Sequence, residues 1–301
     1  MKRLMAAMAG LAGMVCAPGI SHADDPLLRP IKPAGAAAWI TPQAPLHIYG
    51  NTYLVGFGAL NVALIRTSAG LILIDGAVPQ GVRAIEANIR RLGFRIADVK
   101  LILNTEPHFD HASGIAALAR DSGATVIASA AAAAVLRSGQ PDSDDPQIAW
   151  GVAYPGVRRV RAIADGTPIR LGDTIVTPHI TAGHTPGSMS WTWRSCEGDR
   201  CLNTVFASSL NPIAGPGYRY TGHPEEADAF RRSFATLRAL PCNILLTPHP
   251  GQSDGDVKAR KLAVSRIPNP FIDDKACRIY AKKYAALFEK RIADEKAGQA
   301  K

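Results

Sequence analysis

The stretch Asn104-Thr105-Glu106-Pro107-His108-Phe109-Asp110-His111 holds four potential metal ligands within six residues, at positions 106, 108, 110 and 111. An apolar run, residues 99–103, precedes it and predicts a buried strand. Residues 112–120 follow, with the apolar spacing of a helix. The four side chains are therefore expected on a loop at the carboxyl end of a strand, where open α/β sheets bind their ligands.

Imidazole and carboxylate groups in this combination are suited to zinc, with iron as an alternative. Alternation along an extended loop places residues 106, 108 and 110 on one side, and His111 adds a fourth ligand from the turn. Two distant loops supply further histidines, His184 in residues 182–188 and His249 in residues 247–251. A simpler interpretation has the histidines capping a helix beside solvated acids. The two additional loops favour a metal centre instead.

The pattern Glu106-x-His108-x-Asp110-His111 resembles the His-x-His-x-Asp-His signature of the metallo-β-lactamase superfamily. The loops around residues 184 and 249 resemble the third and fourth metal-binding loops of that family, and the resemblance extends from about residue 53 to the last expected helix. It is most similar to subclass B3, in which variants that replace the first histidine are known. The resemblance implies an α/β protein with the αββα sandwich of the metallo-β-lactamase type.

For the metal centre, the resemblance implies two zinc ions per subunit. A water or hydroxide between them would be the nucleophile. Asp110 would be the catalytic residue, which binds one metal and orients this nucleophile. Glu106 adds one negative charge relative to the usual histidine, which should weaken the activation of water. The alternative is that Glu106 turns away and binds no metal. The implied ligands are Glu106, His108 and His184 for one zinc, and Asp110, His111 and His249 for the other.

The segment Phe206-Ala207-Ser208-Ser209-Leu210-Asn211-Pro212 contains no acid. Thioesterases of the glyoxalase II type and lactone hydrolases of the superfamily carry a bridging aspartate here, so its absence favours a lactamase. Ser209 and Asn211 fall where B3-like enzymes have polar groups that meet the substrate carboxylate. The resemblance therefore makes both of them substrate-binding residues.

The implied function is hydrolysis of the β-lactam amide bond by metal-bound hydroxide, carried out by a periplasmic class B β-lactamase that confers antibiotic resistance. Two alternatives remain. One is another hydrolase of the same fold, a lactonase or thioesterase, and the other is a non-catalytic periplasmic metal-binding protein. We expect a β-lactam as the small-molecule partner and a monomeric protein. Scattered Lys and Arg without aromatic interleaving argue against nucleic acid.

The amino terminus has the pattern of a secretory signal peptide. Lys2 and Arg3 precede an uncharged run, residues 4–20, and Ser21-His22-Ala23 resembles an A-x-A cleavage site. We expect cleavage after Ala23, a single domain over residues 24–301, a periplasmic location and no stable membrane insertion; a retained anchor is the alternative. Cleavage removes two cations and lowers the formal net charge from +9 to +7. The positive charge that remains favours anionic substrates.

Five cysteines are present, and Cys16 leaves with the signal peptide. The other four allow three pairings in an oxidising compartment. Cys196 and Cys201 bracket a turn between two strand-like runs, so we predict that they join. Cys242 would then pair with Cys277 and attach the last helix near the strand that precedes His249.

Periodicity predicts the order strand, helix, strand, helix, strand between residues 71 and 128, which indicates parallel pairing in this half. The second half is β-rich, with hairpins over residues 169–177 and 189–207. Residues 140–154 begin no periodic element and form either a surface loop or a flap beside the cleft. His223 is either a helix N-terminal residue or a substrate contact, whereas His47 and His179 are expected to be packed or at the surface.

Overall fold

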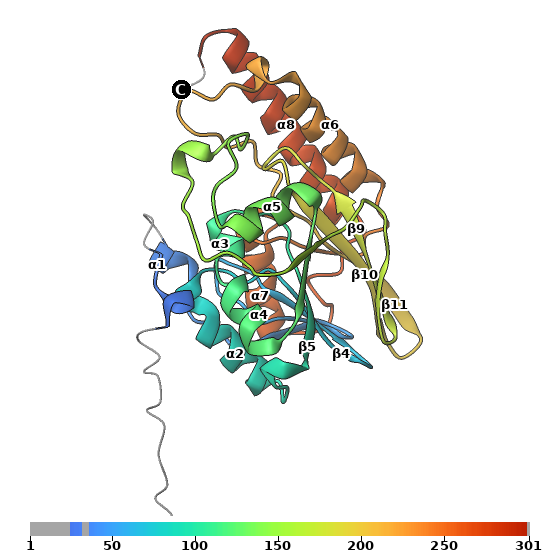
Figure 1. Ribbon diagram of the computed structural model, residues 1–301. Helices are drawn as coiled ribbons and strands as arrows, with labels where there is room; N and C mark the ends of the chain where they lie inside the picture. Colours follow the sequence, from blue (N-terminus) through green and yellow to red (C-terminus); the bar gives the residue numbers. More distant parts are fainter. Residues whose placement is uncertain (1–24, 32–35, 300–301) are drawn as a thin grey trace, which may run out of the picture.

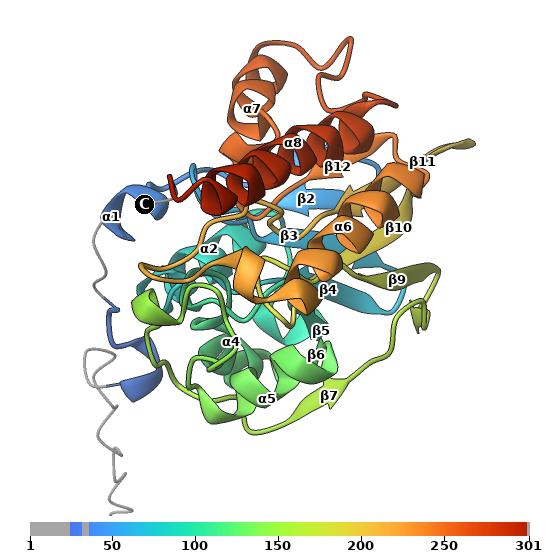
Figure 2. The same ribbon diagram turned by 90° about the horizontal axis from the view of Figure 1, so that it is seen from above.

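The computed structural model describes residues 25–31 and 36–299. The predicted signal peptide, residues 1–23, lies outside the described residues. Two β-sheets pack face to face, and helices cover both outer faces (Figures 1 and 2). This arrangement confirms the αββα sandwich predicted from the sequence. None of the described helices is long and apolar enough to cross a bilayer.

The first sheet has seven strands in sequence order. Its first four strands pair antiparallel with their neighbours, and the last four run parallel to one another, as the strand–helix pattern predicts. The strands are β1 (Leu46–Tyr49), β2 (Thr52–Leu54), β3 (Ala63–Thr67), β4 (Gly70–Ile74), β5 (Val99–Leu103), β6 (Thr125–Ala128) and β7 (Val160–Ala162).

The second sheet has five strands in the order β12-β11-β10-β9-β8. Both predicted hairpins form here, β8 with β9 and β10 with β11, and β12 adds parallel to β11. The bounds are β8 (Ile169–Leu171), β9 (Thr174–Ile180), β10 (Met189–Glu197), β11 (Arg200–Phe206) and β12 (Ile244–Leu246).

Strand β4 shows why the central strands are continuous apolar runs. Alternate side chains of a strand point to opposite faces of the sheet. Leu71 and Leu73 therefore pack under the helices that cover the first sheet, whereas Ile72 and Ile74 pack between the two sheets. Because both faces of β4 are buried, polar residues are excluded from it.

Each outer face is covered by helices with one apolar side. Helices α2, α4 and α5 lie on the first sheet, and α6 and α8 lie side by side on the second, where Phe230 of α6 meets Phe288 of α8 (Figures 1 and 2). The helices are α1 (Ala36–Trp39), α2 (Val82–Arg91), α3 (Phe109–Ala112), α4 (Ile115–Ser122), α5 (Ala130–Ser138), α6 (Pro224–Ala239), α7 (Gly255–Val264) and α8 (Ala276–Lys296).

Several elements were not predicted from the sequence, among them the edge strands β1 and β7 and helix α7. The two strands contain four and three residues, too few for a period-2 pattern to stand out. Helix α7 buries only Leu262 and Gly255, so it lacks the apolar stripe that identifies a helix in a sequence.

Both predicted disulfides are confirmed. Cys196 and Cys201 occupy opposed positions of the β10–β11 hairpin and form one bond. Cys242 and Cys277 form the other, which joins the segment before β12 to the start of α8.

Candidate metal centre

Three loops carry the six predicted ligands to one edge of the sandwich. The loop after β5 holds Glu106 and His108 and continues into α3, which contains Asp110 and His111. The loop between β9 and β10 supplies His184, and His249 follows β12. Each of these segments begins where a strand ends, so the sheets themselves fix the spacing between loops that lie far apart in the sequence.

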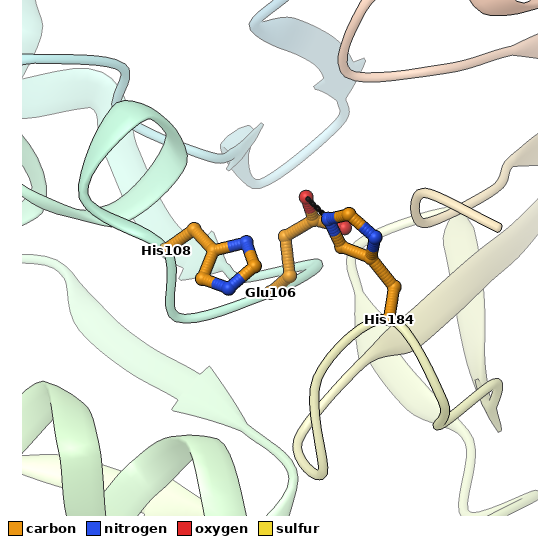
Figure 3. Close-up of side chains that lie close together, drawn as sticks. All are labelled: Glu106, His108 and His184. Atoms are coloured by element: carbon orange, nitrogen blue, oxygen red, sulfur yellow. Dashed lines mark ion pairs between the residues drawn. The ribbon is translucent and has the colours of Figure 1, made fainter. Parts of the chain in front are cut away.

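The structure brings the six side chains together as two adjoining groups. Within each group the candidate ligand atoms all lie within 4.8 Å of one another. Glu106, His108 and His184 form the first group, and Figure 3 shows their side chains converging from two loops. Asp110, His111 and His249 form the second group.

Glu106 turns inward, and the environment of its carboxylate fits a cation. The side chain is completely buried, and Oε2 accepts a hydrogen bond of 2.9 Å from the backbone N–H of Ser209. Oε1 is buried and finds no hydrogen-bond partner among the described residues. Nε2 of His111 lies 3.1 Å and Nε2 of His184 3.6 Å from Oε1. A buried carboxylate oxygen beside imidazole nitrogens is the donor set that zinc binds, so these residues fit the ion that the sequence predicts.

Opposite charges within the centre shift the ionisation of its members. Burial opposes ionisation of Asp110, but His111 and His249 outweigh it and hold the pKa of Asp110 well below its usual range. Burial also opposes ionisation of Glu106, but the charges of His111 and His184 outweigh burial and lower the pKa of Glu106. Burial disfavours charge on His111 as well, yet Asp110 and Glu106 raise the pKa of His111 well above its usual value. Both carboxylates are therefore ionised and ready to bind a cation.

Two of the histidines are held by partners outside the two groups. Nδ1 of His184 lies 2.9 Å from the backbone oxygen of Asn211, which leaves Nε2 facing Glu106. Nε2 of His108 lies 2.9 Å from Oδ2 of Asp145. Metal-binding histidines commonly make such contacts with the ring nitrogen that does not face the metal. Asp145 was not singled out from the sequence, because it lies in the aperiodic segment 140–154.

Asp75 is a second residue that the sequence analysis missed. It follows β4, is completely buried, and its carboxylate accepts hydrogen bonds from the backbone N–H and hydroxyl of Thr105 and from the amide of Asn104. Burial raises the pKa of Asp75 to about 7. The residue positions the start of the loop that carries Glu106. The signal available in the sequence was an acid directly after a buried strand, next to Gly76.

A cavity of about 720 Å³ opens above the metal-binding residues. Five of the six predicted ligands line it, all but Glu106, which lies deeper. Trp39, Phe109 and Ile213 are among its apolar walls. The segment 140–154 forms a large part of the wall, so the interpretation as a flap beside the cleft is the one that the structure supports. Its lining residues there are Pro141, Asp142, Asp145, Gln147, Ile148, Trp150, Gly151, Val152 and Tyr154.

The two predicted substrate-binding residues lie in different places. Asn211 lines the cavity, as a substrate contact requires. Ser209 does not; its side chain is completely buried, and its hydroxyl accepts a hydrogen bond from the amide of Gln252. We correct the expected position of Ser209 accordingly. The chain turns after β11 so that the backbone of Ser209, and not its hydroxyl, meets the metal centre.

The other histidines among the described residues, His47, His179 and His223, do not line the cavity. His223 is exposed, stands immediately before α6 and stacks on Tyr218 with ring centroids 4.4 Å apart. This supports the helix N-terminal interpretation over the substrate contact. His47 bonds to the backbone oxygen of Gly50, and His179 bonds to Thr192. Both are structural, as the sequence predicts.

Residues 55–249 match the family described as the metallo-beta-lactamase superfamily, and the chain belongs to it. One solved structure is that of the first B3 metallo-beta-lactamase characterised with an active-site glutamic acid. It is 46% identical, with a TM-score of 0.83, over 91% of this chain and 99% of that one.

Two further solved structures are similar to this chain. The Rm3 metallo-beta-lactamase is 42% identical, with a TM-score of 0.85, over 88% of this chain and 100% of that one. A subclass B3 enzyme isolated from a soil metagenome library, MEM-A1, is 42% identical, with a TM-score of 0.83, over 86% and 99%. The prediction of a subclass B3 metallo-β-lactamase with glutamate at the first ligand position is confirmed.

Proposed function

We propose that this protein is a periplasmic, zinc-dependent enzyme that hydrolyses the amide bond of β-lactam antibiotics and thereby confers resistance. The observation that carries the proposal is the buried Oε1 of Glu106, which has no hydrogen bond among the described residues and lies beside the imidazole nitrogens of His111 and His184, below an open cavity. The similarity to a B3 enzyme with an active-site glutamic acid supports it.

The two groups of ligands are suited to two zinc ions per subunit, one held by Glu106, His108 and His184 and one by Asp110, His111 and His249. When bound, zinc would polarise the carbonyl oxygen of the substrate and lower the pKa of a water molecule toward neutrality. The remaining work falls to the protein. The apolar walls of the cavity receive the body of the substrate and displace water from around the reacting amide.

Asp110 has the properties of the residue that orients the attacking water. Its Oδ2 is fixed between two imidazoles, 3.2 Å from Nε2 of His111 and 3.1 Å from Nε2 of His249. Because its pKa is held well below its usual range, the carboxylate stays ionised and can accept a hydrogen bond from the water. Asn211, on the cavity wall, is placed to hydrogen-bond the anionic group of a substrate with its side-chain amide.

Two observations support the location and the substrate class. The amino-terminal charge pattern is that of a signal peptide, and two disulfides indicate an oxidising compartment such as the periplasm. The segment 206–212 contains no acid, whereas lactone hydrolases and thioesterases of the glyoxalase II type carry a bridging aspartate there. We propose that the enzyme acts as a monomer.

The test combines metal analysis with turnover of a chromogenic cephalosporin by the purified protein. We expect two zinc ions per chain, loss of turnover on chelation and recovery when zinc is returned. Zinc binding without turnover of the cephalosporin, a lactone or a thioester would indicate a non-catalytic binder. Turnover of a lactone or thioester alone would indicate a different hydrolase of the same fold.

A further inference from the structure

The segment 140–154 holds a buried carboxylate against the centre. Asp145 is only 5% exposed although it lies in a loop at the surface of the cavity. Its two oxygens have different partners. Oδ2 lies 2.9 Å from Nε2 of His108, and Oδ1 accepts a hydrogen bond of 2.7 Å from the backbone N–H of Gln147. The carboxylate is therefore oriented by its own loop and directed at one histidine.

The loop is anchored at two points after Asp145, which fixes the position of its carboxylate. The hydroxyl of Tyr154 donates to the backbone oxygen of Pro107, the residue before His108, over 2.8 Å. The backbone N–H of Gly215 donates to the oxygen of Pro146, the residue after Asp145, over 2.8 Å. The segment thus contacts two consecutive residues of the metal-binding loop, the backbone of Pro107 and the ring of His108.

A carboxylate is an acceptor only, so its contact with Nε2 requires a proton on that nitrogen. In a neutral imidazole, Nδ1 then carries the lone pair and becomes the atom that can bind a metal. Figure 3 shows the ring of His108 with one nitrogen turned toward Glu106 and His184. Since Nε2 is engaged with Asp145, the nitrogen on the side of the first metal group is Nδ1.

We propose that Asp145 is a positioning residue for the first metal site, which selects the His108 tautomer with a free Nδ1 and fixes the angle of the ring. This inference rests on the proposed function of the centre. Its consequence is that two carboxylates act on the same metal, Glu106 directly and Asp145 through His108. A carboxylate behind a ligand histidine also raises the basicity of that ligand, so Asp145 strengthens metal binding at the site where Glu106 replaces the family's histidine.

The substitution Asp145→Asn separates this role from support of the loop. The amide oxygen of asparagine can still accept from Gln147, so the turn is retained. Its NH₂ group then faces Nε2 of His108 and favours the opposite tautomer, with the proton on Nδ1, which cannot bind a metal. Asp144→Asn is the matched control. Asp144 is exposed and does not line the cavity, and its substitution removes the same charge one residue away.

The test is titration of the metal-free protein with zinc, together with NMR of the cadmium-loaded protein to identify each site. For Asp145→Asn we expect zinc affinity at the first site to fall by about 10–100-fold. Binding at the second site and the melting temperature should stay at the wild-type values, and Asp144→Asn should match the wild type. Wild-type zinc affinity at both sites of Asp145→Asn would overturn the inference, as would an equal loss at both sites.

A second measurement applies even if the variant does not fold. Long-range nitrogen–proton NMR of the zinc-loaded wild-type protein reports the protonated nitrogen of each histidine. We expect the proton of His108 on Nε2, and a proton on Nδ1 would overturn the proposal. Failure of the proposed function would look different: the wild-type protein would bind zinc and show the Nε2 proton, but would not turn over a cephalosporin.

Discussion

The backbone N–H of Ser209 donates to Oε2 of Glu106 over 2.9 Å, while Oε1 of the same carboxylate is left without a hydrogen bond among the described residues. One oxygen is thus occupied by the protein and the other is left for a cation. We therefore expect Glu106 to bind a metal through this single oxygen, in the place where the family's signature has one imidazole nitrogen. This division of the two oxygens also explains why a shorter carboxylate could not replace Glu106 without losing one of the two contacts.

Removal of Glu106 should affect one metal site more than the other. In Glu106→Ala we expect zinc affinity at the first site to fall by at least about tenfold, the minimum seen when even a residue supporting a ligand is lost. Asp110, His111 and His249 should keep their zinc. Zinc titration monitored for each site checks this. Equal stoichiometry and affinity in the variant and the wild type would mean that Glu106 does not bind metal.

Glu106→His should change the pH dependence of turnover. The negative charge of Glu106 opposes loss of a proton from the attacking water and so raises the pKa of that water. Turnover requires the deprotonated form, so removing the charge should move the acidic limb of the pH–rate profile to lower pH. The measurement is kcat against pH for both proteins, with metal content verified at each pH. A shift to higher pH would contradict this account of the charge.

Asp110→Asn should damage turnover much more than folding. The substitution removes the charge that binds metal and orients the water, and losing such a group costs about 10²–10⁴-fold in rate. The melting temperature of the zinc-loaded protein should change little by comparison. Steady-state kinetics, metal analysis and thermal unfolding on one preparation provide the test. A variant with both zinc ions and more than about a tenth of wild-type kcat would remove Asp110 from the role assigned to it.

Ser209→Ala should affect stability and leave KM unchanged. The backbone N–H that holds Glu106 is present in alanine, and only the buried contact between the hydroxyl and Gln252 is lost. We expect the free energy of unfolding to fall by about 0.5–1.5 kcal/mol, the net value of one hydrogen bond. Asn211→Ala, on the cavity wall, is the comparison and should raise KM. If Ser209→Ala raised KM as much as Asn211→Ala, the hydroxyl would reach the substrate after all.

Zinc binding to the second site should release a proton near neutral pH. Asp110 and Glu106, acting against burial, raise the pKa of His111 well above its usual value in the metal-free protein. Zinc binds only the neutral imidazole. Below the raised pKa, affinity should therefore increase by about tenfold per pH unit for one released proton. Calorimetry in buffers of different ionisation enthalpy measures that proton, and no dependence on the buffer would contradict the assignment.

The two disulfides should differ in their contribution to stability. In the chain-entropy model a longer closed loop gives more stabilisation. The cysteines at 242 and 277 are separated by 35 residues and those at 196 and 201 by 5. Replacing both cysteines of a pair by alanine should cost about 3–4 kcal/mol for the longer loop and about 2 kcal/mol for the shorter. Denaturant unfolding of the two double variants tests the order, which a larger loss from the hairpin pair would reverse.

The structure also shows which helices and strands of this chain can be identified from the local pattern of apolar residues. The predicted strands β4 and β5 and the helix α2 are long enough for their apolar period to identify them. The strands β1 and β7 were missed because they are too short to show a period. Helix α7 is as long as α2 but was missed because it buries only Leu262 and Gly255 and so lacks an apolar stripe. The same limit applies at the centre to Asp145, whose segment 140–154 has no periodicity. Asp75 follows the predicted strand β4 directly, but only the structure shows its contacts with Asn104 and Thr105.

The sequence by itself predicted an α/β protein and the two disulfides and, through its resemblance to the metallo-β-lactamase signature, the six clustered residues and the αββα sandwich. It could do so because apolar runs and a signature of metal-binding residue types are properties of the chain before it folds. Only the tertiary structure decided that Asp145 faces His108 from 37 residues away, that Ser209 presents its backbone to Glu106, and that residues 140–154 line the cavity. Loop positions of this kind are set by packing and hydrogen bonds between distant segments, which leave no period in the sequence.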